Sequence, residues 1–264
     1  MRGGRGYPAP VLHCALSALL AAAVELGAPA ALPGPTLAGR VLDLALVDGR
    51  RVLALTSGEL VLLRLGDRGL TPESRLPLPG PLAPVRQPGG MIAPAPGSAW
   101  VAASHLASPL LVQLDPRLSV RSRASRLPWS GAPAGLAFVD GTDLVDGAVS
   151  GLPPGPHLDL APGLALSAVG RLLTANGPAL GLRLGPPLSL PWPDVVVASG
   201  PAPPSPADEL IAVGLLPEPH VLARLPVPGP VRGIVCDVHG ERATALVAHG
   251  EPAGWLTVPL RRLP

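Results

Sequence analysis

The sequence predicts an all-β protein made of repeated antiparallel strands, and three observations lead to this prediction. Short runs of Leu, Val and Ala alternate with turns rich in Gly, Pro and Asp, which is the pattern of strands in a meander. The tripeptide Arg-Leu-Pro occurs four times, at residues 75–77, 126–128, 224–226 and 262–264. Two copies extend into octapeptides, 75–82 and 224–231, that differ only by Leu and Val exchanges. A recurring segment of this kind indicates a repeat architecture.

The composition fits such a fold but leaves it few large side chains. The chain has 264 residues, of which 47% are hydrophobic, and this is enough to bury a sizeable core. Because there is one Phe and one Tyr, Leu, Val and Ala must fill most of that core. We expect the four tryptophans to pack between neighbouring sheets and not to stack on a ligand. They are Trp100, Trp129, Trp192 and Trp255.

The charge distribution argues against nucleic acid as a partner. The net charge is +2, and the 20 basic residues are all arginines that are scattered along the chain. A nucleic-acid-binding surface usually requires a clustered basic patch.

Residues 1–30 have the order of a secretory signal peptide. Arg2 and Arg5 precede an apolar run at 11–24, and a small-x-small cleavage site follows at 28–30. The run is too short to span a bilayer comfortably, so we expect cleavage and no stable membrane insertion afterwards. An uncleaved anchor and the absence of any signal are the alternatives. The sequence therefore predicts an exported protein, periplasmic or extracellular, with one domain at 31–264.

The two cysteines do not indicate a disulfide or a reactive thiol. Cys14 lies inside the predicted signal, and the residues before it do not form the apolar run of a lipoprotein signal. The mature chain then has one cysteine, Cys236, within an apolar run. We expect it to be a buried structural thiol.

Two parts of the chain give the clearest strands. In the first part, four short strands are separated by tight turns such as Asp48-Gly49, and together they form one antiparallel meander. A single meander of this kind is apolar on both faces and must stack on neighbours, which a β-propeller provides. The predicted strands are 41–47, 51–55, 60–65 and 70–78 near the beginning and 231–236, 242–248 and 255–260 near the end.

The Leu-Pro marks divide the chain into blades. Because proline cannot donate a ladder hydrogen bond, it suits the outer edge strand of a blade. Taken as blade ends, the marks lie about 47 residues apart on average, which is within the usual span of a propeller blade. We therefore predict a β-propeller of about five, or six, four-stranded antiparallel blades, with an irregular third blade. The marks are Pro77, Pro128, Pro191, Pro226 and Pro264.

The strand and turn order resembles the FG-GAP/VCBS-type repeats of secreted β-propellers. The resemblance covers residues 41–81 and 231–260, with a weaker copy at 194–230. It implies a calcium loop between the first two strands of a repeat, but the loops 48–51 and 237–241 lack the dense set of oxygen ligands that calcium needs. We therefore expect no calcium site in either.

Other candidate residues favour structural roles. Asp140, Asp143 and Asp146 form the densest acidic cluster, and their spacing fits two Asp-Gly turns better than a cation loop. Ser167 lies in an apolar, strand-like stretch, and no nucleophile elbow, phosphate loop or dinucleotide motif occurs. We predict no catalytic, cofactor-binding or metal-binding residues and no cofactor. The histidines show no metal-ligand spacing; they are His105, His157, His220, His239 and His249.

Three interpretations of the function remain open. The first is a non-enzymatic exported propeller that binds or scaffolds an unknown protein or glycan. The second is a propeller hydrolase or lactonase-like enzyme with a polar site centred on the channel, and the third is a divergent remnant without a ligand site. An apolar or Arg-lined channel would favour the binding module. The enzyme would be favoured by convergence of three or more of Asp48, Asp143, Asp194, Asp237 and His239 in the channel.

Overall fold

Every regular element of the described residues is a β-strand, and the strands form antiparallel sheets, which confirms the all-β class. The computed structural model describes residues 23–79, 90–103, 106, 110–115, 117–123, 137–139, 143–145, 157–161, 164–167, 172–174, 177–178, 185–201, 208–215 and 219–263.

The first complete sheet agrees with the meander predicted from the sequence. Its strands pair in chain order, and the Asp48 side chain accepts hydrogen bonds from the backbone N–H groups of Arg50 and Arg51 in the first turn. The strands are β3 (Val41–Asp48), β4 (Arg51–Thr56), β5 (Glu59–Gly66) and β6 (Gly69–Pro77).

Within the described residues, the chain continues through four more sheets before the last one. One is formed by β7 (Gly90–Ala95), β8 (Ser98–Ala103), β9 (Leu110–Gln113) and β10 (Ser119–Arg123). A two-stranded sheet pairs β11 (Ala137–Val139) with β12 (Asp143–Val145). Another contains β13 (His157–Ala161), β14 (Leu164–Ser167), β15 (Leu172–Thr174) and β16 (Gly177–Pro178). The next contains β17 (Gly185–Trp192), β18 (Val195–Pro201), β19 (Asp208–Gly214) and β20 (His220–Pro226).

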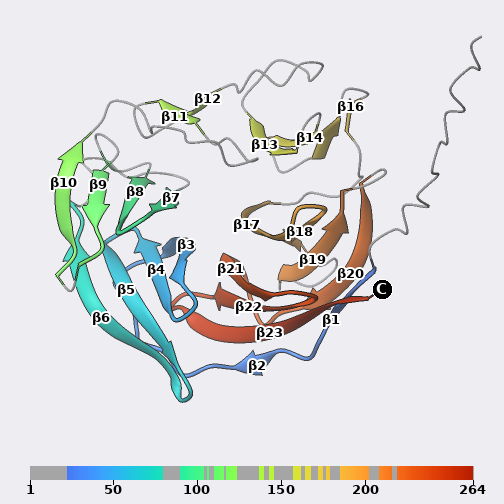
Figure 1. The fold of residues 1–264 in the computed structure, drawn as a ribbon, viewed down its shortest axis with the longest axis horizontal. Helices are drawn as coiled ribbons and strands as arrows, with labels where there is room; N and C mark the ends of the chain where they lie inside the picture. The colour runs from blue at the N-terminus through green and yellow to red at the C-terminus, as the bar shows by residue number, and fades with distance from the viewer. Residues whose placement is uncertain are drawn as a thin grey trace, which may run out of the picture.

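The last sheet contains strands from both ends of the described chain. Its order is β1-β23-β22-β21, and β2 also pairs with β23. Figure 1 shows β1 and β2 along the outer side of β23. The strands are β21 (Val231–His239), β22 (Arg242–His249), β23 (Gly254–Leu263), β1 (Ala23–Leu26) and β2 (Ala30–Ala31).

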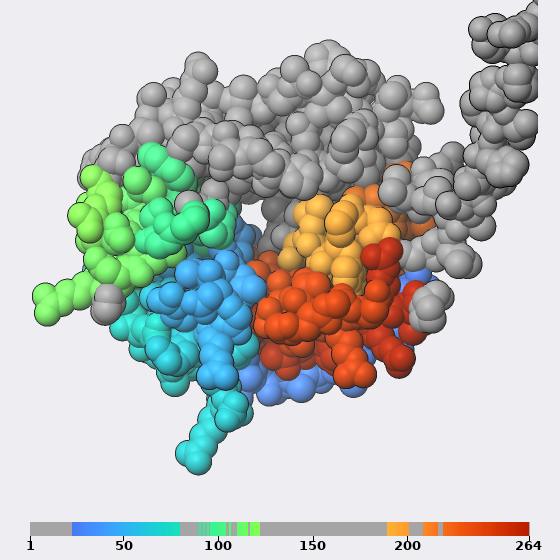
Figure 2. All heavy atoms as spheres, viewed as in Figure 1, coloured from blue at the N-terminus to red at the C-terminus, as the bar shows by residue number. Residues whose placement is uncertain are grey.

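The sheets are arranged as the blades of a β-propeller. The first strands of successive sheets contact one another, β17 with β21, β21 with β3, and β3 with β7. These strands lie toward the middle of the molecule, whereas β6, β10 and β20 lie at its periphery (Figure 1). Figure 2 shows the atoms of β3–β6, in blue and cyan, directly against those of β21–β23, in orange and red. The number of blades stays a prediction.

Two of the Leu-Pro marks lie where we predicted them, and two do not. The marks at Pro77 and Pro226 end the outer strands β6 and β20. Pro191 lies in the inner strand β17, and the last Arg-Leu-Pro lies at the end of β23, which is covered by β1. The predictions of blade ends at these two positions were wrong: Pro191 lies in β17, the first and innermost strand of its sheet, and the outer place of the last sheet is taken by the N-terminal β1. The mark at 126–128 lies outside the described residues.

The arginine of the mark has a repeated structural role. Arg75 Nη1 donates to Glu59 Oε1 at 2.6 Å, and Arg224 Nη1 donates to Glu209 Oε1 at 2.6 Å. Both glutamates are buried, and each arginine lies on the neighbouring outer strand in the same register relative to its glutamate. The repeated tripeptide therefore supplies the cation that a buried carboxylate on the third strand requires.

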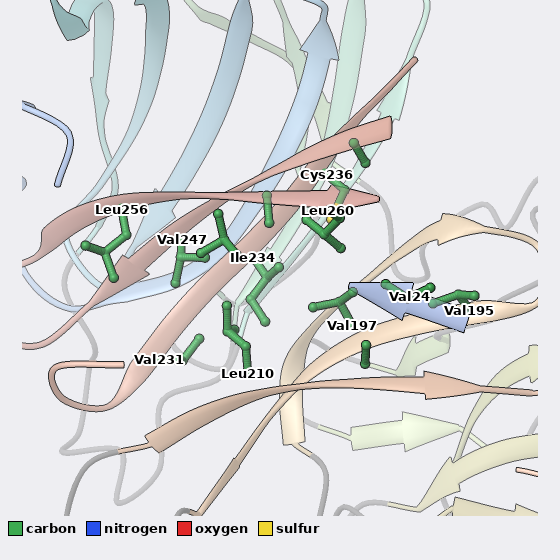
Figure 3. Close-up of a cluster of buried hydrophobic side chains, with 14 of the residues drawn as sticks. Val24, Val195, Val197, Leu210, Val231, Ile234, Cys236, Val247, Leu256 and Leu260 are labelled. Atoms are coloured by element: carbon green, nitrogen blue, oxygen red, sulfur yellow. The ribbon is translucent and has the colours of Figure 1, made fainter. Parts of the chain in front are cut away.

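Apolar side chains fill the space between neighbouring blades. One cluster joins the β17–β20 and β21–β23 sheets, and Figure 3 shows Val197, Leu210, Ile234 and Val247 within it. A second cluster lies between the first sheet and the β7–β10 sheet, and a third lies between the first and last sheets. Both faces of the first sheet are thus buried, as its apolar sequence required.

The tryptophans and the cysteine of the described residues also have packing roles. Trp192 donates from Nε1 to the carbonyl oxygen of Gly240 in the next blade at 2.9 Å. Trp255 is buried and donates to the carbonyl oxygen of Pro35 at 3.3 Å. Burial raises the pKa of the Cys236 thiol to about 11, while a hydrogen bond with Ser189 opposes the shift. At neutral pH this thiol is protonated and unreactive.

The pairing of β1 with β23 yields a prediction on stability. A chain that lacks residues 1–30 should be less stable than one that lacks residues 1–22 by at least about 2 kcal/mol, because it loses the buried Val24 side chain and leaves β23 unpaired. Urea unfolding of both chains would measure the difference. Equal stability would show that β1 contributes nothing to the ring.

The repeated ion pair yields a second prediction. Arg75→Ala should destabilise the fold by about 1.5–3 kcal/mol, because it removes a charged hydrogen bond to the buried Glu59 carboxylate. The control is Arg64→Ala on the same sheet, which removes the exposed pair with Glu73 and should cost at most about 1 kcal/mol. Thermal unfolding of the two variants would compare them. A cost for Arg64→Ala as large as that for Arg75→Ala would contradict the assigned role.

Candidate functional site

Two arginines that are distant in the sequence lie at the beginnings of two neighbouring inner strands, β3 and β21. Arg40 immediately precedes β3, and Arg232 is the second residue of β21. The backbone of Arg40 is fixed by Ser57, which accepts from its N–H at 3.1 Å and donates to its carbonyl oxygen at 2.9 Å. Arg232 lies at a β-bulge, beside a Val231 N–H that donates to the Asp208 carboxylate at 2.9 Å. Both guanidinium groups therefore extend from anchored backbone.

The two strands approach closely because a glycine faces the neighbouring blade. A Cβ atom at Gly233 would lie 2.5 Å from Leu44 Cγ, closer than real Cβ contacts. Gly90 of β7 has the same role on the other side of β3, where a Cβ atom would lie 2.7 Å from Leu55 Cδ2 and 3.0 Å from Leu42 Cβ. These glycines bring the inner strands, and with them Arg40 and Arg232, close together.

The arginine pair has buried donors without partners. The Nε atoms of Arg40 and Arg232 are both inaccessible to solvent and have no hydrogen-bond acceptor. Burial lowers the pKa of the Arg40 guanidinium, the charge of Arg232 lowers it further, and Glu251 on the turn between β22 and β23 opposes these effects. The site thus combines two half-buried positive charges with polar hydrogens that the described residues do not satisfy.

A carboxylate lies farther along β3. Asp43 accepts a hydrogen bond from the backbone N–H of Leu44 at 2.9 Å through Oδ1, and from that of Ile92 in β7 at 2.7 Å through Oδ2. Burial raises the pKa of Asp43 to about 7, although these two hydrogen bonds oppose the shift. Asp43 therefore connects two inner strands and changes its protonation near neutral pH.

Three of the carboxylates whose convergence would favour an enzyme each have a different interaction partner. Asp48 pairs with Arg51 at 2.7 Å, Asp194 with Arg262 at 2.6 Å, and Asp237 with His239 at 3.1 Å. In the described part of the chain, no group of three or more His, Cys, Asp or Glu residues is arranged to hold a metal ion. The structure does not bring these carboxylates to one point.

Several sequence candidates lie outside the described residues or have side chains that are not described. His249 Nδ1 lies 3.0 Å from the carbonyl oxygen of Pro228, so it contacts the loop before β21. His220 also has an interaction partner. The candidates that cannot be placed in the site are Cys14, His105, Trp129, Asp140, Asp143, Asp146, His157 and Ser167.

A hollow of about 410 Å³ lies elsewhere, on the last sheet. Glu25 of β1, Arg242 of β22 and Arg261 of β23 line it. All three residues have exposed or half-buried surfaces, and Arg242 lies at the turn between β21 and β22, at the opposite end of β21 from Arg232. Solvent screens such exposed charges, so this hollow is a weaker candidate than the arginine pair.

Sequence reasoning missed the three central residues of this site. Arg40 and Arg232 come together only because the first and last described sheets are neighbours. Asp43 had a local signal, since it is a single carboxylate within the apolar run 41–47.

Among the described residues, no helix has the length and apolar composition needed to cross a bilayer.

The comparisons with known proteins concern the fold alone. No family model matches the chain and no curated protein matches it, so the resemblance to FG-GAP/VCBS repeats stays a prediction. Glutaminyl cyclase from Myxococcus xanthus shares 12% identity, with 92% of this chain and 98% of that chain covered and a TM-score of 0.46. A structural genomics protein of unknown function from Bacteroides thetaiotaomicron shares 10% identity, with 90% and 76% covered and a TM-score of 0.49. The β-propeller domain of Cps50 (Swd1) from Myceliophteria thermophila shares 14% identity, with 85% and 98% covered and a TM-score of 0.44.

Asp43 yields a prediction on pH dependence. Its pKa is raised in the folded state, so the native protein binds more protons than the unfolded chain between about pH 4 and 7. The free energy of unfolding should therefore fall as pH rises through this window, by at most about 4 kcal/mol. Asp43→Asn should remove this contribution, so its stability relative to wild type should improve from pH 5 to pH 8.

Chemical unfolding at several pH values would measure this difference. The control is Asp67→Asn in the exposed turn after β5, which should show no such trend. A stability difference between Asp43→Asn and wild type that does not change with pH would contradict the assignment.

Proposed function

We propose that the protein is an exported β-propeller that acts as a non-enzymatic binding module, with a protein or glycan as its partner. The observation that carries this proposal is the arginine pair at the start of the inner strands. Arg40 and Arg232 present buried Nε donors without partners, and such donors favour the binding of an acceptor group. Arginines at the start of the inner strands are consistent with the apolar or Arg-lined channel that we expected of a binding module.

The arrangement of the carboxylates supports the same proposal. General acid and base catalysis requires ionisable groups within reach of the same reacting atoms. Asp48, Asp194 and Asp237 each bind a different partner, and each therefore contributes to local structure in place of a shared site.

The alternative is a hydrolase or lactonase-like enzyme with a channel-centred polar site, and one observation favours it. The pKa of Asp43 is about 7, a value suited to a general acid or base. However, both carboxylate oxygens of Asp43 accept backbone hydrogen bonds, from Leu44 and Ile92. This arrangement suits a residue that joins two strands, and we therefore favour the binding module.

Export of the protein is part of the proposal. The signal-like sequence precedes and overlaps β1, which begins at Ala23. We propose that processing occurs before β1, so that residues 23–31 remain to complete the last sheet. N-terminal sequencing of the protein recovered from its native cells should then give a start no later than Ala23. A start at Ala31 would overturn this part of the proposal.

The binding function can be tested against the enzymatic alternative. The purified processed protein should not hydrolyse a panel of lactones, carboxylic esters and phosphate esters above the uncatalysed rate. Turnover that Asp43→Asn abolishes, and that Asp67→Asn retains, would overturn the binding proposal and establish the alternative.

A further inference from the structure

We propose that Arg40 and Arg232 form a binding site for a single carboxylate group of the ligand, such as that of a uronic acid or of a peptide C-terminus. The inference rests on the proposed binding function and names the chemical group that the site recognises. Among the described residues, two buried side-chain nitrogen or oxygen atoms have no hydrogen-bond partner. They are the Nε atoms of Arg40 and Arg232, and the inference starts from them.

The unpaired donors are the first argument for a ligand. A buried polar group without a partner costs about 1–3 kcal/mol, and more when it is charged. Arg40, just before β3, and Arg232, in β21, carry two such groups. Because both residues are half-buried as a whole, an oxyanion can approach the exposed part of each guanidinium, whose planar fork of hydrogens matches two oxygens.

The like charges of the pair are the second argument. The residues next to the two arginines are in contact, since a Cβ atom at Gly233 would lie 3.3 Å from Val41 Cγ1, and the charge of Arg232 lowers the pKa of Arg40. Neither arginine has an ion pair with a carboxylate of the described residues. Elsewhere in the fold, Arg75 and Arg224 are paired with buried glutamates. The arginine pair could bind a carboxylate as Arg75 and Arg224 do, but here the carboxylate would have to belong to a ligand.

The local charge selects a monoanion. Glu251 acts on Arg40 from the turn between β22 and β23 and offsets part of the positive charge. The Asp208 carboxylate accepts from the Val231 N–H beside Arg232, so two arginines face two carboxylates. A carboxylate ligand adds one negative charge to this balanced set, whereas a phosphate dianion adds two and is repelled more strongly by Glu251 and Asp208. We therefore assign a carboxylate and treat phosphate as a competing outcome.

The pair is held in place for binding. Ser57 fixes the Arg40 backbone through two hydrogen bonds. The Val231 N–H bond to Asp208 fixes the strand before Arg232, and Gly233 lets that strand lie against Leu44. A preorganised site loses less entropy when the ligand binds.

The test uses the processed protein in buffer of low ionic strength, with glucuronate, glycylglycine and inorganic phosphate as probes. Glucose is the neutral counterpart of glucuronate. Calorimetric titration should show binding of glucuronate or glycylglycine and none of glucose, and binding should weaken as salt is added. Tighter binding of glucuronate would indicate a glycan as the source of the carboxylate, and tighter binding of glycylglycine would indicate a peptide.

Three variants assign the binding to this site. Arg40→Gln and Arg232→Gln should each lower the affinity for the carboxylate at least tenfold. Arg50→Gln is the matched control, because Arg50 is exposed at the other end of the same strand, beside Asp48; it should leave the affinity unchanged. Arg232→Lys keeps the charge but loses the fork, so it should bind more weakly than wild type.

Stability measurements separate loss of the site from loss of the fold. Because Arg232→Gln removes a repelling charge next to Arg40, the ligand-free variant should be at least as stable as wild type in thermal unfolding. The carboxylate should raise the melting temperature of wild type and Arg50→Gln, and it should not raise that of Arg232→Gln.

The inference is overturned if neither carboxylate binds at tens of millimolar, if both Gln variants bind as wild type does, or if phosphate binds tenfold more tightly than both carboxylates. These outcomes leave the binding function itself standing. Hydrolysis that depends on Asp43 would overturn that function, whatever the behaviour of the arginine variants.

Discussion

The structure depends on one constraint, which is that a Leu- and Val-rich meander is apolar on both faces. Such a sheet has no polar face to turn to water, so each blade must be covered by a blade on either side. The first sheet shows this directly, because separate apolar clusters cover its two faces. With so few aromatic side chains, the interior is filled by small residues, and the inner strands pack tightly at Gly90 and Gly233.

Tight packing of this kind requires that polar groups between the blades be satisfied. Glu59 and Glu209 meet this requirement through the arginines of the repeated tripeptide, and Asp43 does so through backbone N–H groups of two strands. Arg40 and Arg232 are different, because their Nε donors are buried without acceptors. Among the described residues, the buried side-chain donors without acceptors thus lie at the beginning of the inner strands, and this is why the functional proposal is centred there.

The sequence predicted what local chemistry determines. The strands from Val41 to Pro77 and from Val231 onward were predicted because each turn carries its own Gly or Asp signal. The blade end at the last Arg-Leu-Pro was predicted wrongly, since the outer partner of β23 is β1, from the beginning of the described chain. The arginine pair was missed for the same reason: no local pattern shows that Arg40 and Arg232 belong to adjacent blades. Asp43 was also missed, although one carboxylate in an apolar run is a local signal of a buried polar group that needs partners.

The pairing of β1 with β23 also determines when the ring can be completed. β1 and β2 are among the first described segments to be synthesised, and β23 is the last. Until β23 emerges from the ribosome, the N-terminal strand has no edge to join, and the last sheet lacks both of its outer strands. Pairing between such distant segments gives a high contact order and slow folding. The last sheet can therefore be completed only after β23 has been synthesised.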